Sequence, residues 1–519
     1  MRKMKMSTPY DLDGRIPLKL AVPLGMQHVL AMFVGNLTPL LVIMGICGIT
    51  AAGGYGALRV SLLQNAMLIA GLITLLQIYP IGPIGGRLPI VMGTSSGFIG
   101  VCSSVAAGII ADDPNAGLIA YGAIMGASII GGLFEGVLGF CLKPLRRFFP
   151  PVVTGTVVMA IGLSLINVGI NFFGGGSNAA DFGSWQNLLL GLIVLVIILV
   201  LKHGTKGFTS ISSILLGIIV GYIIATVMGF ILPKTGVTAE GVEYTKAWVV
   251  QWSKVGESGW FALPKLLPVK PVFQWRAIIP ICIMFIVTAV ETIGDVSGIT
   301  EGGLDREATD KELSGSVVCD GVGSSIAAVF GVLPNTSFSQ NVGLVGMTKI
   351  VNRFAIACGA IFLILAGLFP KLGAIISIMP QSVLGGAAVI MFASIVVSGI
   401  QLITREKLSP RTITIVAVSL GLGFGLGASS SVLKQTPQWL QYIFGGSGIV
   451  PAALVAIILN IVIPKDSVNK SAPAADGESA LTPVDSAACE LVEHGSSQCA
   501  SVTADESDSN GKSVDSKQE

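Results

Sequence analysis

Two acidic residues lie inside an apolar stretch near the middle of the chain. Glu291 and Asp295 fall within residues 279–300, which are otherwise rich in Ile, Val and Ala. A carboxylate in hydrocarbon costs at least about 2.5 kcal/mol on insertion scales. Side chains four residues apart share one face of a helix. This face is the first candidate for a functional site, at which the carboxylates would face a cavity, a cation or a polar ligand. Asp295 could instead reach the inner headgroups.

Four more polar residues interrupt or begin apolar segments. Asp320 lies among small residues without a basic residue nearby in sequence, so it fits a proton-exchanging group or a hydrogen-bonded helix contact. His28 lies in the first apolar run, where we expect a hydrogen-bonded or relay role. Gln340 and Asn341 are adjacent amides, which offer a donor and an acceptor to the edge of a planar heterocycle. Asn is also a good helix cap, so Asn341 has a structural alternative.

The composition identifies the chain as an integral membrane protein. Of its 519 residues, 52% are hydrophobic and 12% are charged, whereas soluble domains carry about 25% charged residues. The net charge of +2 gives no reason to expect a nucleic-acid partner. The eight cysteines follow no metal-binding pattern, so neither a metal nor a cofactor is expected.

Apolar segments of spanning length recur along the chain and predict an all-α membrane protein with about fourteen transmembrane segments. The third and tenth segments begin with Leu-Pro and small polar residues. A plain helix through lipid does not fit them, because backbone groups would go unpaired, so we expect extended peptide followed by a half-helix. The predicted segments are residues 20–46, 57–79, 89–110, 117–141, 149–172, 186–202, 209–232, 277–299, 314–332, 335–351, 354–378, 381–403, 411–428 and 446–464.

Lys and Arg residues set the expected orientation. With the N-terminus inside, the short inner loops are rich in Lys and Arg, and the short outer loops hold only Lys371 and Lys434. This pattern predicts cytoplasmic termini, namely residues 1–19 and a polar, disordered tail at 465–519. The long outer loop 233–276 is an exception, and part of it is expected to lie on the membrane surface through Trp248, Trp252, Trp260 and Trp275.

A faint internal repeat links the third and tenth segments. LPIVMGTSSGFIG (88–100) and LPNTSFSQNVGLVG (333–346) align with one gap, and each contains Gly-x-x-Gly. The copies lie seven segments apart, an odd number that inverts the orientation of one copy. Inverted repeats with a matching pair of broken helices are typical of secondary transporters, whose half-helix N-termini face the ligand near the midplane.

Other protein classes fit the sequence less well. GTSSG (93–97) matches the G-x-S-x-G pattern of hydrolases, but no suitable later histidine accompanies it, and no P-loop or H-E-x-x-H is present. The chain is therefore not expected to be an enzyme. A scaffold or receptor without transport activity would not need carboxylates in apolar segments.

Residues 337–349, SFSQNVGLVGMTK, resemble the signature of the nucleobase/ascorbate transporter family, of the nucleobase:cation symporter-2 type. Its pattern, roughly Q/E-N-x-G-x(4)-T-R/K/G, is satisfied from Gln340 to Lys349. Similar segments occur in the first span (PLGMQHVLAMFVG), in the eighth (ETIGD) and around Asp320, so the resemblance covers about residues 17–464.

This resemblance implies two inverted seven-span repeats, with short strands and half-helices in spans 3 and 10. It also implies a homodimer and, in most members, proton coupling. A core domain would comprise about residues 20–141 and 277–378, and a gate domain about residues 149–232 and 381–464. The implied substrate-binding residues are Glu291, Gln340, Asn341, Thr94 and Ser95.

The resemblance also implies coupling groups and a substrate. Asp295, Asp320 and His28 would serve proton coupling or architecture. Uracil-type members usually carry Glu where Gln340 stands, so this residue favours the xanthine and uric acid branch. We therefore expect a purine:proton symporter of the plasma membrane that imports xanthine, uric acid or both. A uracil or other nucleobase carrier or an ascorbate carrier is the alternative. An anion permease of the same fold would need a fixed cation, for which the eighth and tenth segments offer only Lys349.

Overall fold

The computed structural model describes most of residues 8–464. The predicted tail at 465–519 lies outside the described residues, as do the first seven residues of the chain. The described ranges are 8–50, 54–113, 115–141, 150–176, 179–206, 208–211, 213–237, 243–256, 258–437, 440–441, 444 and 448–464.

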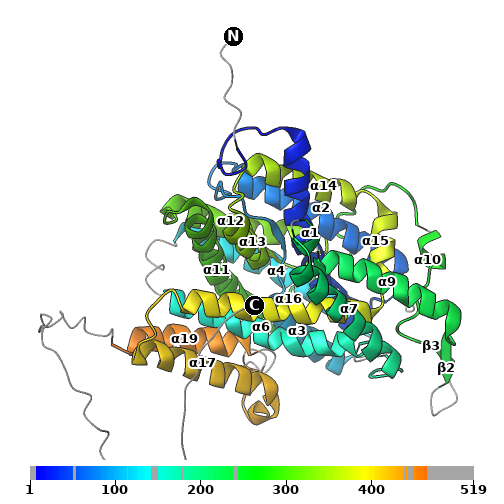
Figure 1. The fold of residues 1–519 in the computed structure, drawn as a ribbon. Helices are drawn as coiled ribbons and strands as arrows, with labels where there is room; N and C mark the ends of the chain where they lie inside the picture. The colour runs from blue at the N-terminus through cyan, green and yellow to red at the C-terminus, as the bar shows by residue number, and fades with distance from the viewer. Residues whose placement is uncertain are drawn as a thin grey trace, which may run out of the picture. The chain divides into compact units, whose positions relative to one another are not determined.

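Helices form most of the described structure (Figure 1). In chain order they are α1 (Leu18–Ile46), α2 (Gly56–Ile78), α3 (Phe98–Asp112), α4 (Gly117–Phe140), α6 (Pro151–Phe173), α7 (Trp185–Gly204), α8 (Phe208–Ile211), α9 (Ser213–Ile231), α10 (Ser253–Gly256), α11 (Trp275–Leu304), α12 (Asp310–Val329), α13 (Ser339–Thr348), α14 (Arg353–Gly367), α15 (Pro370–Ser377), α16 (Gln381–Ile403), α17 (Pro410–Ala428), the 3-10 helix η2 (Ser430–Leu433) and α19 (Ile449–Val462). Every apolar segment predicted from the sequence overlaps a helix. Within the described residues, eight helices are long and apolar enough to cross a membrane, or nine when the bent pair α14 and α15 counts as one span.

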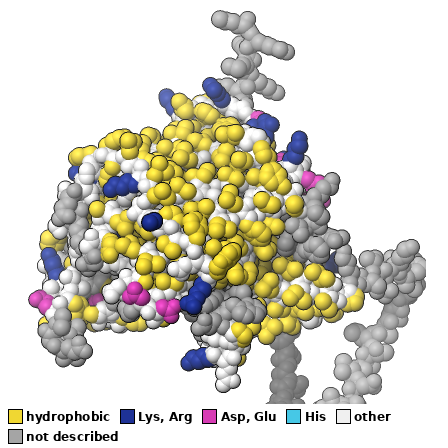
Figure 2. Space-filling model, turned by 180° about the vertical axis from the view of Figure 1, so that it is seen from behind, with side chains coloured by type: hydrophobic (Ala, Val, Ile, Leu, Met, Phe, Trp, Pro, Cys, Tyr) yellow, Lys and Arg dark blue, Asp and Glu magenta, His cyan; other side chains and the backbone are white. Residues whose placement is uncertain are grey.

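Hydrophobic side chains also cover much of the outer surface. Figure 2 shows one face of the molecule on which they dominate. Val137, Phe230 and Ile458, for example, are 62%, 81% and 54% exposed. Apolar exposure on this scale is unfavourable in water but matches contact with lipid tails.

Two short strands pair inside the helical structure. β1 (Met92–Thr94) and β4 (Asn335–Ser337) are antiparallel, with Gly93 opposite Thr336. Each strand precedes a short helix, α3 or α13, as predicted for the third and tenth segments. Pairing provides partners for backbone groups that no helix satisfies. Glycine is required at Gly93, because a Cβ there would lie 2.7 Å from Asn36 Oδ1.

One hydroxyl group holds each strand at its first residue. Thr74 Oγ1 on α2 accepts from the Met92 N–H (2.9 Å) and donates to the Met92 carbonyl (3.3 Å). Ser324 Oγ on α12 makes the same two bonds with Asn335, at 3.0 and 2.9 Å. The helix that precedes each strand therefore fixes it in the same way.

The repeat alignment read from the sequence is out of register with these strands. β4 begins directly after Leu-Pro, whereas Ile90 and Val91 separate Leu-Pro from β1. The two Gly-x-x-Gly motifs also differ, since Gly97 precedes α3 while Gly343 lies inside α13. Strand limits are set by pairing between the two segments, which a comparison of their letters does not contain.

The helices fall into two sets that pack mainly within themselves. In the first set, α4 packs against α11 and α12, and α14 packs against α1 and α2. The first set also contains α3, α13 and both paired strands. In the second set, α6 packs extensively against α16, α7 against α9, and α17 against α19. The two sets touch through fewer contacts, chiefly between α11 and α6, between α13 and α16, and between α1 and α9.

The eleventh predicted segment is not one straight helix. It is divided into α14 and α15, which are bent by 89° relative to each other. Pro370 begins α15 and has no N–H with which to continue α14, which ends at Gly367. The sequence prediction of one continuous span therefore missed a break that the proline imposes.

The tryptophans of the long loop 233–276 do not share one environment. Trp248 is fully buried, so its predicted place on the membrane surface is wrong. The Asp181 carboxylate accepts from the N–H of Ala247 at 3.1 Å, which fixes the chain beside Trp248 against the helices. Trp252 and Trp260 remain 46% and 73% exposed. The loop also contains a small hairpin of strands β2 (Thr235–Val237) and β3 (Glu243–Thr245).

Candidate functional site

Asp295 lies on α11 beside the junction of β4 and α13. Its side chain is buried, and Oδ2 accepts hydrogen bonds from Ser337 Oγ (2.7 Å) and Ser339 Oγ (3.2 Å). Hydrogen bonds to an ionised acceptor are roughly twice as strong as neutral ones. A charged Asp295 would therefore tie α11 firmly to the broken tenth segment, and a neutral one would hold it less tightly.

Asp320 lies on α12 and contacts the same strand. Its Oδ2 accepts from Thr336 Oγ1 at 3.2 Å and from Thr292 Oγ1 of α11. Its Oδ1 has no hydrogen-bond partner within the described part of the chain. Thr292 also lies 3.4 Å from Ser337 Oγ, which donates to Asp295. The two aspartates therefore belong to one buried cluster of hydroxyl and carboxyl groups.

A small cavity of about 20 Å³ lies where the two helix sets meet. Glu291, Gln340, Thr94 and Ser95 line it from the first set. The second set contributes Ile161 of α6 and Ile395 of α16. The cavity has room for roughly one water molecule, far less than the about 300–1,000 Å³ of small-molecule pockets. The site is therefore closed in this conformation.

Two oxygen atoms at this cavity have no hydrogen-bond partner among the described residues, Glu291 Oε2 and Thr94 Oγ1. Both side chains are buried. Unpaired buried polar atoms are rare in folded proteins, so these oxygens have bonding capacity left for a ligand. A carboxylate here accepts an N–H, and a hydroxyl donates or accepts. Carboxyl, amide and hydroxyl groups line the cavity, an arrangement that suits the binding of a polar ligand.

Asn341 is not among the residues that line this cavity. Its Nδ2 donates to the Pro89 carbonyl at 2.9 Å, and its Oδ1 is hydrogen-bonded to His28 Nδ1. Because an amide oxygen only accepts, His28 Nδ1 carries the proton. Both side chains are buried. The pair braces α13 against α1 and against the chain that leads into β1.

The sequence analysis missed one buried carboxylate, Glu135 on α4. This residue is fully buried, and its Oε1 accepts from Thr288 Oγ1 of α11 at 3.0 Å. A signal was available, because Glu135 is the only charged residue in the apolar segment 117–141. Among the described residues, the first set thus places four carboxylates in its interior, Glu135, Glu291, Asp295 and Asp320.

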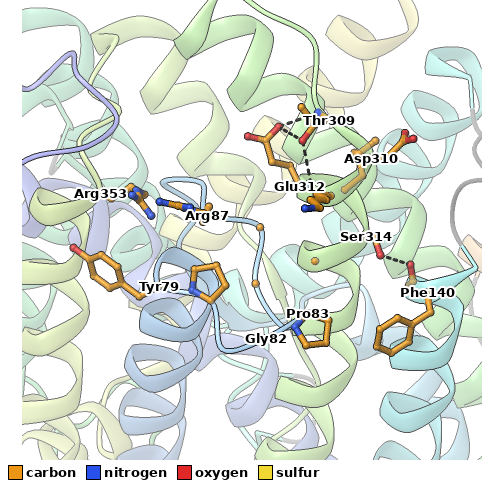
Figure 3. Close-up of a pocket in the computed structure, with 17 residues that line it drawn as sticks. Tyr79, Gly82, Pro83, Arg87, Phe140, Thr309, Asp310, Glu312, Ser314 and Arg353 are labelled. Carbon is orange, nitrogen blue, oxygen red and sulfur yellow. Dashed lines mark hydrogen bonds between the residues drawn. The ribbon is translucent and has the colours of Figure 1, made fainter.

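A larger cavity of about 980 Å³ lies apart from this site (Figure 3). Arg87 and Arg353 lie on one side of it, and Thr309 and Glu312, at the start of α12, lie on the other. Burial raises the pKa of Glu312, but hydrogen bonds from Arg306 and Thr309 outweigh burial and lower it. All the lining segments belong to the first set, so this cavity is not at the boundary between the sets.

Comparison with known proteins places these features in a family. The sequence pattern of the Permease family matches residues 19–431. The chain is 33% identical to the xanthine permease XanP of Escherichia coli (strain K12) over 470 residues, which cover 88% of this chain and 95% of XanP. It is 34% identical to the uric acid permease PucK of Bacillus subtilis (strain 168) over 441 residues, which cover 84% and 94% of the two chains.

A solved structure shares the fold. The transmembrane domain of a cyanobacterium bicarbonate transporter, BicA, aligns with a TM-score of 0.50 over 87% of this chain and 100% of that chain, at 18% identity. At this identity the likeness concerns the fold alone. Since the family pattern spans both paired strands, the buried carboxylates and most of the described helices, the chain is a multi-pass membrane protein that belongs to the Permease family, a family of transporters rather than enzymes.

Proposed function

We propose that this permease imports a purine base, xanthine or uric acid, together with a proton across the plasma membrane. The observation that carries the proposal is a carboxylate and an amide, Glu291 and Gln340, at one cavity between the helix sets. XanP and PucK, to which the chain is similar, are named for xanthine and uric acid. The fold shared with a bicarbonate transporter is compatible with a purine or a small anion as substrate. The choice of a purine therefore depends on the polar residues at the cavity.

The proposed recognition uses hydrogen bonds to the edges of the purine. Oxidised purines carry ring N–H and C=O groups side by side. Glu291 accepts ring N–H groups through a charge-assisted bond, and Gln340 offers a donor and an acceptor to another edge. Thr94 and Ser95 contact the base from the third segment. Asn341, whose amide is already bonded to Pro89 and His28, positions α13.

The proposed architecture is fourteen spans in two inverted seven-span repeats, with both termini cytoplasmic. Support comes from the packing, since each main helix contact has a counterpart seven segments away. α4 on α12 corresponds to α14 on α2, α4 on α11 to α14 on α1, and α17 on α19 to α7 on α9. The first set is then the core domain and the second set the gate domain. We also propose that two copies of the chain form a homodimer through their gate domains.

In the proposed transport cycle the two sets move relative to each other. The closed cavity cannot admit a purine, so binding requires the sets to separate on one side of the membrane at a time. The limited contact between the sets favours such movement. The Glu301 carboxylate and the Arg405 guanidinium, which join α11 to the end of α16 at 2.9 Å, must part when the sets separate at that point.

Proton coupling rests on the buried carboxyl groups. A proton that enters with a neutral purine carries one charge, worth about 2.3 kcal/mol per 100 mV of membrane potential. A pH gradient adds about 1.4 kcal/mol per unit. Asp295 and Asp320 are the proposed coupling groups, because Glu291 is committed to the substrate.

Labelled xanthine uptake into cells that express the full chain tests this function. We expect saturable uptake that unlabelled xanthine or uric acid inhibits, while uracil, ascorbate and bicarbonate compete poorly. A proton uncoupler should abolish accumulation. Glu291→Gln should lose most uptake while the protein still reaches the membrane, because an amide keeps the shape of the carboxylate but not its charge. Inhibition by uracil and not by purines, or accumulation that follows sodium and survives the uncoupler, would contradict the proposal.

A further inference from the structure

Glu135 is a buried carboxyl group that has no role in the substrate binding or proton coupling proposed above. It lies in the fourth predicted segment and is fully buried. Oε1 accepts the hydroxyl of Thr288, and Oε2 has no hydrogen-bond partner within the described ranges. The carboxyl group is thus only half satisfied by the protein around it.

The neighbours of Glu135 are acidic or neutral. α4 packs against α11 and α12, from which Glu291 and Asp320 interact electrostatically with it. α4 also contacts α3, whose one charged residue, Asp112, pairs with Arg276 at the exposed surface. α1 contributes a buried histidine that is hydrogen-bonded to α13 rather than to Glu135. Among the described residues, no cation is paired with Glu135.

Two nearby carboxylates without a cation cannot both be charged at low cost in a low-dielectric interior. Thr288 and Thr292 lie one turn apart on α11; the first bonds Glu135 and the second bonds Asp320. A change in the charge of Asp320 therefore acts on Glu135 at short range. The arrangement of lowest free energy keeps at least one of the two carboxyl groups protonated.

We propose that Glu135 is a proton-carrying residue of the transport cycle, with Asp320 as the group whose charge it balances. The O–H bond on Glu135 breaks when its proton is released to the inner side and forms again from the outer side. Water on the inner side accepts the released proton, and hydronium on the outer side donates the one that replaces it. This inference rests on the proposed proton-coupled uptake and adds the fourth segment to it.

A purely structural role makes a different prediction. As a brace, Glu135 needs only an oxygen that accepts from Thr288. Glu135→Gln keeps that oxygen and the shape of the side chain but cannot exchange a proton. Thr288→Val removes the hydrogen bond and keeps the carboxyl group. The two substitutions therefore distinguish a proton-carrying role of Glu135 from a purely structural one.

The test uses the purified full chain in vesicles with labelled xanthine. With an imposed gradient of one pH unit, the unsubstituted protein should accumulate xanthine about tenfold if one proton enters per purine. Glu135→Gln should bring that ratio close to 1 while exchange of xanthine without a gradient continues. Thr288→Val should still accumulate. If Glu135→Gln accumulates xanthine like the unsubstituted protein, Glu135 is a brace and the inference is wrong.

A second measurement does not depend on the folding of a variant. Dicyclohexylcarbodiimide reacts with protonated carboxyl groups in apolar surroundings, and mass spectrometry of the unsubstituted protein locates the adduct. We expect labelling at Glu135 that decreases as pH rises, and its absence would overturn the inference. An unsubstituted protein that does not accumulate xanthine contradicts the proposed function instead, so the two failures are distinguishable.

Discussion

The two strand-and-helix segments, β1 with α3 and β4 with α13, have the same backbone arrangement but different hydrogen-bond partners. Thr74 and Ser324 fix the first residue of their strands through the same pair of bonds. At the third residue the partners differ. The Thr94 N–H donates to the amide of Asn36 on α1 at 2.8 Å, whereas the Ser337 hydroxyl donates to the carboxylate of Asp295 on α11 at 2.7 Å.

This difference teaches that the framework is doubled while the ionisable groups are not. An amide supplies an acceptor without a buried charge, so Asn36 can hold its strand at little cost. A carboxylate is costly in the same place and is useful only where charge or a proton must be handled. Glu291, Asp295 and Asp320 all lie on α11 and α12, next to β4. These ionisable groups therefore lie on the helices beside the tenth segment, whereas the acceptor that holds the third segment is neutral.

Replacing Asp295 by Asn, the residue type of its counterpart Asn36, should have the largest effect on transport. Asp295→Asn removes the charge that Ser337 and Ser339 donate to, and hydrogen bonds to charged groups contribute about 1.5–3 kcal/mol. We expect proton-driven xanthine accumulation to fall at least about tenfold on that scale. Asp295→Glu, which keeps a carboxyl group, serves as the control. Unchanged accumulation in the Asn variant would mean that the asymmetry between the segments has no role in coupling.

The reciprocal change, Asn36→Asp, should mainly reduce stability. Asn36 is fully buried, and its Nδ2 lies 3.4 Å from the Ala66 carbonyl, which would then face an oxygen atom. A buried charge without an opposite charge costs about 3–5 kcal/mol. The measurement is the thermal midpoint of the detergent-solubilised protein. Asn36→Ala, which removes the acceptor without adding charge, is the matched control and should lose less. Equal losses in the two variants would show that charge is tolerated in the third segment.

Side chains at the two half-helix starts should affect different aspects of specificity. Gln340→Glu should shift competition toward uracil-like bases, because it adds a second carboxylate beside Glu291. Thr94→Ala and Ser95→Ala should alter the choice among purines without changing the substrate class. Inhibition of labelled xanthine uptake by a panel of bases measures both effects. An inhibitor profile that is unchanged in all three variants would place the site elsewhere.

The hydroxyl anchors should be equivalent in the two segments. Thr74→Val and Ser324→Ala each leave a buried strand N–H without its partner, which costs about 1–3 kcal/mol. We expect similar drops in thermal midpoint for the two variants. Thr226→Val is the control, because it removes a hydroxyl that donates to the Tyr222 carbonyl of its own helix. A much larger drop for one anchor would show that the two strands are not held alike.

The ion pair between the sets should have the smallest effect. Glu301 and Arg405 are 47% and 34% exposed, and exposed pairs contribute about 0–1 kcal/mol. Glu301→Gln should leave stability nearly unchanged and should alter the transport rate only modestly, more at low salt than at high salt. A loss as large as that of Asp295→Asn would mean that this contact, rather than the tenth segment, controls the cycle.

The sequence by itself determined the helices and the position of the costly charges. Every predicted apolar segment overlaps a helix, because the length and hydrophobicity of a segment are local properties. The broken third and tenth segments were also recognisable, since Leu-Pro and small polar residues do not suit a helix in lipid. Glu291 and Asp295 stood out because a carboxylate in an apolar run is conspicuous.

The tertiary structure alone decided which of these groups meet. The register of β1 on β4 depends on pairing between segments more than 240 residues apart in the chain. Asn341 bonds His28 and the Pro89 carbonyl rather than facing the cavity, Trp248 is buried, and Glu135 lies against Thr288. These outcomes follow from contacts across the chain, where a buried polar atom takes whichever partner the packing of distant helices brings within reach.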